Sequence, residues 1–332
     1  MNKKIIYAML IALGALIILW IALRNIGSPT GKPESLAALD IEFDAAKAAR
    51  IDVYKRDYPD SGLHFAKIDT LWVIANEYNA PAKQADVVKL MSDLNTVGGQ
   101  IRGESADLYG DFDITDERAL QLEIFDSEGS KLLHAYIGKG GSGRDCFIRL
   151  AGSPVVYLAS ENFISRFAAW NASPEKKLPA DRWTELTLCG IPRDKIKSIK
   201  IKRDKTEFEF ALVQESSGDT LTPATEIWKQ ISPEKGLQLD ENKIKRLHSS
   251  LAGMRGSGVT DPGNKDQFGL DSPDCSVRVA DAEGNSSYIK FSKPVKDDGE
   301  RYAVIEGKDV VFVVPKATFD RVFEDSFKKP DK

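Results

Sequence analysis

The chain carries one sequence pattern twice, and this internal repeat limits its architecture more than any other feature. Matching residues recur in the same order at an offset of about 148 to 159 positions. The pairs are Trp72 with Trp228; Val87, Leu90 and Leu94 with Ile244, Leu247 and Leu251; Tyr109-Gly110 with Phe268-Gly269; Tyr157 with Phe312; and Phe163, Arg166 and Phe167 with Phe319, Val322 and Phe323. A period this long is too great for a solenoid, so we predict a duplicated domain.

Each copy shows the pattern of a mainly antiparallel sheet with two helices. Apolar and polar residues alternate at 51–55 and 199–203, as in a strand with one wet face. In the first copy, apolar residues at 87, 90, 91 and 94 fall on one helical face. We expect a closing helix that holds Phe163, Phe167 and Trp170. The predicted fold class is α+β, with one long and one terminal helix in each copy.

The organisation along the chain follows from these patterns. We assign residues 1–24 to an N-terminal transmembrane anchor and residues 25–44 to a linker rich in Gly, Ser and Pro. Residues 45–170 form the first α+β repeat, 171–195 a connector, and 196–327 the second repeat.

The N-terminal segment from Ile5 to Leu23 contains no charged residue. Nineteen residues at a rise of 1.5 Å span about 28 Å, which matches the hydrocarbon thickness of a bilayer. A cleaved signal peptide is the alternative, but its apolar core is usually shorter and ends in small residues. We therefore expect an uncleaved anchor that contacts the lipid bilayer. The charge bias around the span is small, and it weakly favours a cytoplasmic N-terminus with the rest of the chain outside the cytoplasm.

Composition limits the class of partner and the redox chemistry. The formal net charge is −4, and the chain lacks the basic field typical of nucleic-acid proteins. Its cysteines, Cys146, Cys189 and Cys275, lie in unrelated places without C-x-x-C spacing. We interpret them as buried thiols, with one disulfide as the alternative.

Several motifs resemble sites without meeting their requirements. Residues 138–143 match G-x-G-x-x-G, but the following residues predict a strand rather than the helix that a dinucleotide fold needs, so we expect a hairpin loop. Asp111 and Asp113 resemble the start of a calcium loop that lacks its later glycine and glutamate. The histidines, His64, His134 and His248, have no zinc spacing. We expect no metal, no cofactor and no catalytic residues.

Two further features leave an alternative open. Trp72 and Trp228 are interpreted as core anchors, although paired aromatic residues also form ligand platforms. A basic run from Lys195 to Lys205 is interpreted as a solvated strand face that discourages edge pairing. Its functional alternative is contact with anionic lipid or an acidic partner.

The chain resembles a bacterial membrane-anchored family of unknown function. The residues that carry the resemblance are Trp72, Tyr109-Gly110, Gly138, Phe147, Gly152 and Val156-Tyr157, with Trp228, Phe268-Gly269-Leu270, Pro273, Tyr302, Gly307 and Val311-Phe312 in the second copy. Asp111 to Thr115 departs from the Gly-Leu-x-x-Pro that the pattern has after Tyr-Gly. The resemblance implies an auxiliary protein encoded beside ABC-type transporters related to gliding-motility systems.

The expected function is that of a non-catalytic, membrane-anchored scaffold outside the cytoplasm, associated with subunits of an ABC-type transporter. The alternative is an extracytoplasmic module that binds a glycan or another small ligand. The predicted structural anchors of the repeat are Trp72, Trp228, Tyr109, Gly110, Phe268, Gly269, Tyr157 and Phe312.

Overall fold

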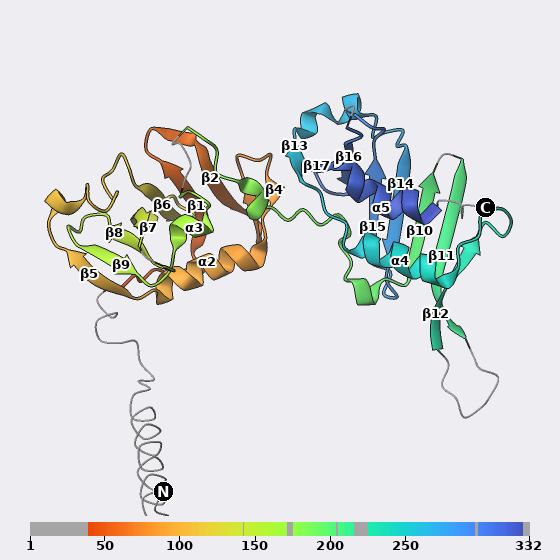
Figure 1. The fold of residues 1–332 in the computed structure, drawn as a ribbon, viewed down its shortest axis with the longest axis horizontal. Coiled ribbons are helices and arrows are strands. Elements are labelled where there is room, and N and C mark those ends of the chain that lie inside the picture. Colours follow the sequence, from red (N-terminus) through yellow and green to blue (C-terminus); the bar gives the residue numbers. More distant parts are fainter. Residues whose placement is uncertain are drawn as a thin grey trace, which may run out of the picture.

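Two antiparallel sheets with few helices make up the described part of the chain (Figure 1). The structure is a computed structural model, and it describes residues 39–141, 143–170, 175–203, 205–215, 225–295 and 298–327, with side chains up to Phe323. The fold class is therefore α+β, as predicted from the strand and helix periodicities.

The first sheet has the strand order β4-β3-β2-β1-β6-β7-β8-β9-β5. Its strands are β1 Ala48–Lys55, β2 Tyr58–Ile68, β3 Leu71–Ile74, β4 Ala80–Pro81, β5 Gly99–Gly103, β6 Leu120–Asp126, β7 Lys131–Gly140, β8 Cys146–Leu150 and β9 Val156–Ala159. Helix α2 (Gln84–Thr96) leads from one edge of the sheet to β5 at the other edge.

The second sheet repeats this arrangement with the order β12-β11-β10-β14-β15-β16-β17-β13. Its strands are β10 Ser198–Arg203, β11 Thr206–Glu215, β12 Thr225–Ser232, β13 Gly258–Thr260, β14 Cys275–Ala280, β15 Ser286–Phe291, β16 Arg301–Ile305 and β17 Val311–Val314. Helix α4 (Glu241–Ala252) takes the place of α2. Apart from β4, each strand of one order has a counterpart in the other, and the predicted repeat is confirmed.

Equivalent residues also occupy equivalent ladder positions. Tyr157 on β9 lies opposite Ile148 of β8 and Ile101 of β5. Phe312 on β17 lies between the corresponding strands, opposite Ala303 of β16 and Val259 of β13. The two copies therefore share strand register as well as strand order at this edge.

Each long helix closes its own core because its apolar residues face the sheet. Val87, Leu90, Met91 and Leu94 of α2 are buried in the first core, which also contains Trp72. Ile244, Leu247 and Leu251 of α4 are buried in the second core, which contains Trp228. A helical period of 3.6 leaves the opposite face of each helix in solvent, where it can carry charge.

The closing helix of the first copy is shorter than predicted. Helix α3 (Phe163–Arg166) begins at Asn162, whose side chain accepts a hydrogen bond from the Ser165 N–H at 2.8 Å. Ala168 adopts a left-handed backbone with φ of 53°, which ends the helix. Trp170 consequently lies beyond the helix and is 54% exposed, so its assignment to that helix is wrong. The counterpart α5 (Lys316–Phe327) is longer.

The connector belongs in part to each core. Leu178 and Trp183 are buried with the first sheet, and Trp183 stacks 5.3 Å from Phe167. Leu186 and Leu188 are buried with the second sheet. Backbone bonds follow the same division, because Lys83 N–H donates to Trp183 O at 2.7 Å and Gly256 N–H to Leu186 O at 2.9 Å.

The predicted anchor from Ile5 to Leu23 lies outside the described residues. Within the described ranges, no helix has both the length and the apolar character needed to cross a membrane.

Candidate functional site

A hollow lies beside the long and the terminal helix in both copies, and the two hollows have the same volume, about 490 Å³. In the first copy it is lined from α2, from α3 and its N-cap region, and from the connector. In the second copy α4 and α5 line it. Because these helices are equivalent in the repeat, the hollows can be compared position by position.

Ion pairs neutralise the hollow of the first copy. Asp93 lies 2.8 Å from the Lys89 ammonium and 2.5 Å from the Arg166 guanidinium. Partial burial acts to raise the pKa of the Asp93 carboxyl, but the hydrogen bonds from Lys89 and Arg166 outweigh it and leave the pKa lowered. Asp93 therefore stays ionised at neutral pH and holds the two cations together.

The hollow of the second copy has lost that arrangement. In the repeat alignment Ser250 replaces Asp93, and Val322 replaces Arg166. Asp86 becomes Lys243 and Lys89 becomes Arg246, while Ser165 becomes Arg321. The position that joined two cations in the first copy thus carries a neutral hydroxyl in the second.

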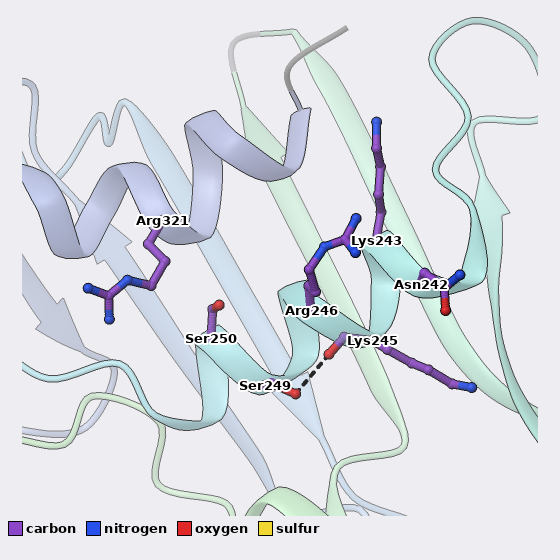
Figure 2. A pocket seen from close by; sticks show the side chains of 7 residues that line it. All are labelled: Asn242, Lys243, Lys245, Arg246, Ser249, Ser250 and Arg321. Atoms are coloured by element: carbon purple, nitrogen blue, oxygen red, sulfur yellow. Dashed lines mark hydrogen bonds between the residues drawn. The ribbon is translucent and has the colours of Figure 1, made fainter. Parts of the chain in front are cut away.

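Four basic residues line the second hollow, and Lys245 is the one that has an ion-pair partner. The other three have none among the side chains that the structure describes: Lys243, Arg246 and Arg321. In Figure 2, Arg246 and Ser250 leave α4 on the side toward α5. Lys245 extends away from them and pairs with Glu241 at 2.7 Å. Ser249 donates to the Lys245 backbone carbonyl at 2.9 Å. We call this hollow the α4–α5 groove.

A second polar feature covers the face of the first sheet opposite the main core. Asp52 lies across from Glu123, and Glu123 lies across from His134 in the ladder. Tyr54 donates to Glu123 at 3.1 Å, and His134 and Gln121 approach to 3.2 Å. Gln121 and Glu123 are both buried, so the row is a satisfied polar network rather than a solvent-facing surface.

The network shifts the pKa values of its members. Burial, followed by the charge and hydrogen bond of Glu123, raises the pKa of Tyr54 to about 12. The hydrogen bond to Asp52 at 2.8 Å raises the pKa of His64. Burial lowers the pKa of His134, although Glu123 opposes it. Folding therefore shifts the pKa values of these two histidines in opposite directions.

Sequence reasoning missed this network. No partner was assigned to His134, because the sequence does not show that β6 lies between β1 and β7. The available signal was the period of two, which puts residues 52 and 54, 121 and 123, and 134 and 136 on one face of three predicted strands.

The predicted anchor residues lie in varied surroundings. Trp72 is 3% and Trp228 is 5% exposed. Tyr109 is half-buried and its hydroxyl donates to Ser153 O at 3.3 Å, whereas the Phe268 ring lies 4.0 Å from that of Tyr302. Phe312 is buried and Tyr157 is half-buried. Gly110 and Gly269 are exposed, and Gly269 has a left-handed φ of 66°.

The glycine-rich run lies in a hairpin, as predicted, but only its last residues belong to the loop, because Gly138 and Gly140 are part of strand β7. Strand β7 ends at Gly140 and β8 begins at Cys146, so no helix follows the glycines. At Gly138 a Cβ atom would lie 2.2 Å from the Phe112 carbonyl oxygen. This glycine is therefore required by a close backbone approach rather than by a phosphate.

The other candidate sites are absorbed into local structure. Asp113 pairs with Arg118 at 2.7 Å. His248 packs against Trp228, and its ring lies 2.9 Å from the Arg193 carbonyl oxygen. All three cysteines are buried thiols, and burial raises the pKa of Cys146 to about 12. No cluster of His, Cys, Asp and Glu suited to a metal occurs within the described ranges.

The basic run proves to lie inside a sheet. Strand β10 pairs with both β11 and β14, so the prediction that its lysines protect a sheet edge is wrong. Lys200 lies 3.2 Å from Glu209, and Lys197 lies 2.9 Å from Glu226. Cross-strand pairing therefore neutralises part of this run.

Together these features define a duplicated α+β protein whose two copies keep one frame and differ in surface charge. The family model described as a domain of unknown function, DUF4340, matches residues 72–266 and again residues 228–329. The chain belongs to this family. Both matches begin at a tryptophan of the repeat, Trp72 or Trp228. No curated protein and no solved structure matches the chain.

Proposed function

We propose that the protein is a non-catalytic scaffold, anchored in the membrane by residues 5–23, that docks onto a membrane complex outside the cytoplasm. The family resemblance favours an ABC-type transporter as this membrane complex. The observation that carries the proposal is the divergence of the two helix-side hollows on an unchanged frame. A duplicated frame whose equivalent surfaces differ in charge offers two distinct contact surfaces, which suits a protein that joins partners.

Purification of the tagged full-length chain in mild detergent tests the docking. We expect transporter subunits to copurify. A matched control replaces residues 5–23 with an unrelated transmembrane sequence, so that the anchor is kept while its own side-chain contacts are lost. Copurification that survives this exchange assigns docking to the two copies. A chain that purifies alone in both forms contradicts the proposal.

Protease treatment tests the orientation. In cells whose outer barrier has been opened, external protease is expected to degrade the bulk of the chain. Full protection would place the two copies in the cytoplasm. A mature N-terminus near residue 27 would show cleavage instead of anchoring.

A ligand-binding role is the second candidate, and one observation favours it. The exposed Trp170 lines a hollow of about 330 Å³ together with Lys55, Asp113 and Arg118. An aromatic ring beside charged hydrogen-bonding groups suits a sugar that needs both stacking and polar contacts. Titration of tryptophan fluorescence with oligosaccharides tests this role. A response in the wild type that is lost in Trp170→Ala supports it, and no response in the wild type rules it out for the sugars used.

A further inference from the structure

We propose that the α4–α5 groove binds an acidic segment of a partner protein through Lys243, Arg246 and Arg321. This inference rests on the proposed function, because it names the kind of surface onto which the scaffold docks. The equivalent hollow of the first copy does not bind such a segment, because Asp93 already forms ion pairs with Lys89 and Arg166.

The repeat supplies an internal comparison for this assignment. In the first copy one carboxylate lies within ion-pair distance of both Lys89 and Arg166. The second copy keeps a hollow of equal volume but has Ser250 where that carboxylate stood. An external carboxylate placed beside Ser250 would take the position that Asp93 has in the first copy, next to Arg246, the equivalent of Lys89. The groove thus has the charge of a site whose counterion is supplied from outside.

Among the side chains of α4 and α5 that the structure describes, no carboxylate pairs with Lys243, Arg246 or Arg321. Glu241 pairs with Lys245, and Asp320 is within ion-pair distance of Lys316, so both carboxylates are engaged elsewhere. Asp240 caps α4 by accepting a hydrogen bond from the Lys243 backbone N–H at 2.8 Å. The positive charges that line the α4–α5 groove create a field that attracts an anionic partner and holds it. This attraction weakens as the ionic strength rises.

The shape of the groove favours a protein segment over a membrane surface. A hollow between two helices admits a chain that projects into it, whereas a flat bilayer would contact only the outermost cations. The lining also includes Asn242, Ser249 and Ser250, whose amide and hydroxyl groups hydrogen-bond to carboxylates. Arg246 and Arg321 can each form two parallel hydrogen bonds with a carboxylate. A segment rich in Asp or Glu offers several carboxylates along its length.

The test uses the full-length chain in nanodiscs of zwitterionic lipid. The probe is a fluorescent glutamate homopeptide, with a glutamine homopeptide as the uncharged control, and binding is read by anisotropy at low and high ionic strength. We expect the glutamate probe to bind at low ionic strength, to be released by salt, and to outbind the glutamine probe.

The decisive variant is Ser250→Asp, which grafts the carboxylate of the first copy into the second. We expect it to weaken binding about tenfold, because the new charge pairs with the groove cations. Ser127→Asp is the matched control, since it makes the same change at an exposed turn of the first sheet and should leave binding unchanged. Arg321→Ser, which restores the residue found at position 165, is a second variant with the same expected loss. Thermal unfolding checks that each variant is folded.

Asp93→Ser provides a gain-of-function arm. It releases Lys89 and Arg166, and we expect a second class of binding site for the glutamate probe. Equal binding by Ser250→Asp and Ser127→Asp would overturn the proposal. So would binding of anionic vesicles that the glutamate probe does not displace, because the groove would then be a membrane contact.

The two proposals fail in different ways. If transporter subunits copurify equally with the wild type and with Ser250→Asp, and the probe does not bind, docking stands and the groove assignment falls. If the probe binds through the groove while no membrane partner copurifies, the assignment of the groove stands and the scaffold role falls.

Discussion

The guanidinium carbon of Arg149 lies 3.6 Å from the ring centre of Tyr136, its cross-strand neighbour on β7. Tyr109 covers the group from another side at 4.5 Å. Arg149 also donates to the Ile114 carbonyl oxygen at 3.0 Å and pairs with Asp116. A buried arginine is therefore fully occupied by rings, a carbonyl and a carboxylate, and it ties the loop before β6 to the sheet.

Removing this arginine should destabilise the first copy. We expect Arg149→Ala to lower the free energy of unfolding by about 2–3 kcal/mol, because it leaves a buried carbonyl and a half-exposed carboxylate without their partner. Arg149→Lys should recover only part of the loss, since an ammonium cannot stack on the two rings as a planar group. Chemical denaturation measures both, and Arg144→Ala, at an exposed site, is the control. A loss no larger than that of Arg144→Ala would contradict the prediction.

The two histidines of the polar network should give opposite pH dependences. The pKa of His64 is raised in the folded state by its hydrogen bond to Asp52, with Asp60 and the Pro59 carbonyl adding to the effect. Its contribution to stability is therefore fully present below the unfolded pKa of about 6.5 and is lost as pH rises through the folded pKa. His64→Gln should cost more stability at low pH than at high pH.

His134 behaves in the opposite sense because its pKa is lowered by burial, with Glu123 and Asp116 opposing and Lys131 and Arg149 assisting. Its neutral form is favoured on folding, so its contribution is present above about pH 6.5 and is lost as pH falls through the folded pKa. Unfolding free energies of the wild type and His134→Gln, measured between about pH 5 and 8, should diverge toward high pH. Parallel curves for this variant and His64→Gln would contradict both assignments.

The paired tryptophans should each stabilise one copy. Trp72→Ala and Trp228→Ala remove nearly buried rings, and such truncations typically cost about 3–5 kcal/mol. Each should lower the melting transition of its own sheet and leave the other in place. The same change at Trp170, which is 54% exposed, should have little effect on melting. Unchanged melting in both core variants would instead indicate that the tryptophans form a ligand platform.

Gly138→Ala should destabilise the first sheet, because its new methyl group would clash with the Phe112 carbonyl oxygen. Gly143→Ala changes the same run at a position where a Cβ meets no atom within 4 Å, and it should be nearly neutral. Thermal unfolding compares the two. Equal effects would show that the glycines of this hairpin are not distinguished by backbone packing.

Local patterns were enough to predict the elements that depend on local sequence. The long helices follow from apolar residues on one face, four in α2 and three in α4. The hairpin of β6 and β7 follows from alternation around a turn with Gly129. Strands β5 and β13 were missed because each is short and pairs only with a strand more than fifty residues further along the chain. No periodicity within Gly-Val-Thr at 258–260 could show that pairing.

The candidate site was less accessible to sequence reasoning than the fold. Charged residues at 86, 89 and 93 can be placed on the solvent face of a helix from their spacing. Arg166 completes the ion pairs across 73 positions, and only the fold brings it there. The difference between the two hollows therefore depends on contacts between the long and the terminal helices, which local sequence patterns do not encode.

The connector is short at the point where it passes from the first core to the second. Trp183 is buried in one core and Leu186 in the other, and the two residues between them are bonded to the first copy: Thr184 pairs with Ala82, and the Glu185 N–H donates to the Pro81 carbonyl oxygen at 2.7 Å. A load applied to the second copy would act first on the Glu185–Pro81 hydrogen bond and then on Trp183, which packs against Phe65 and Phe167. Tension between the two copies would therefore be carried by strand-like backbone bonds before it reached the buried ring of Trp183.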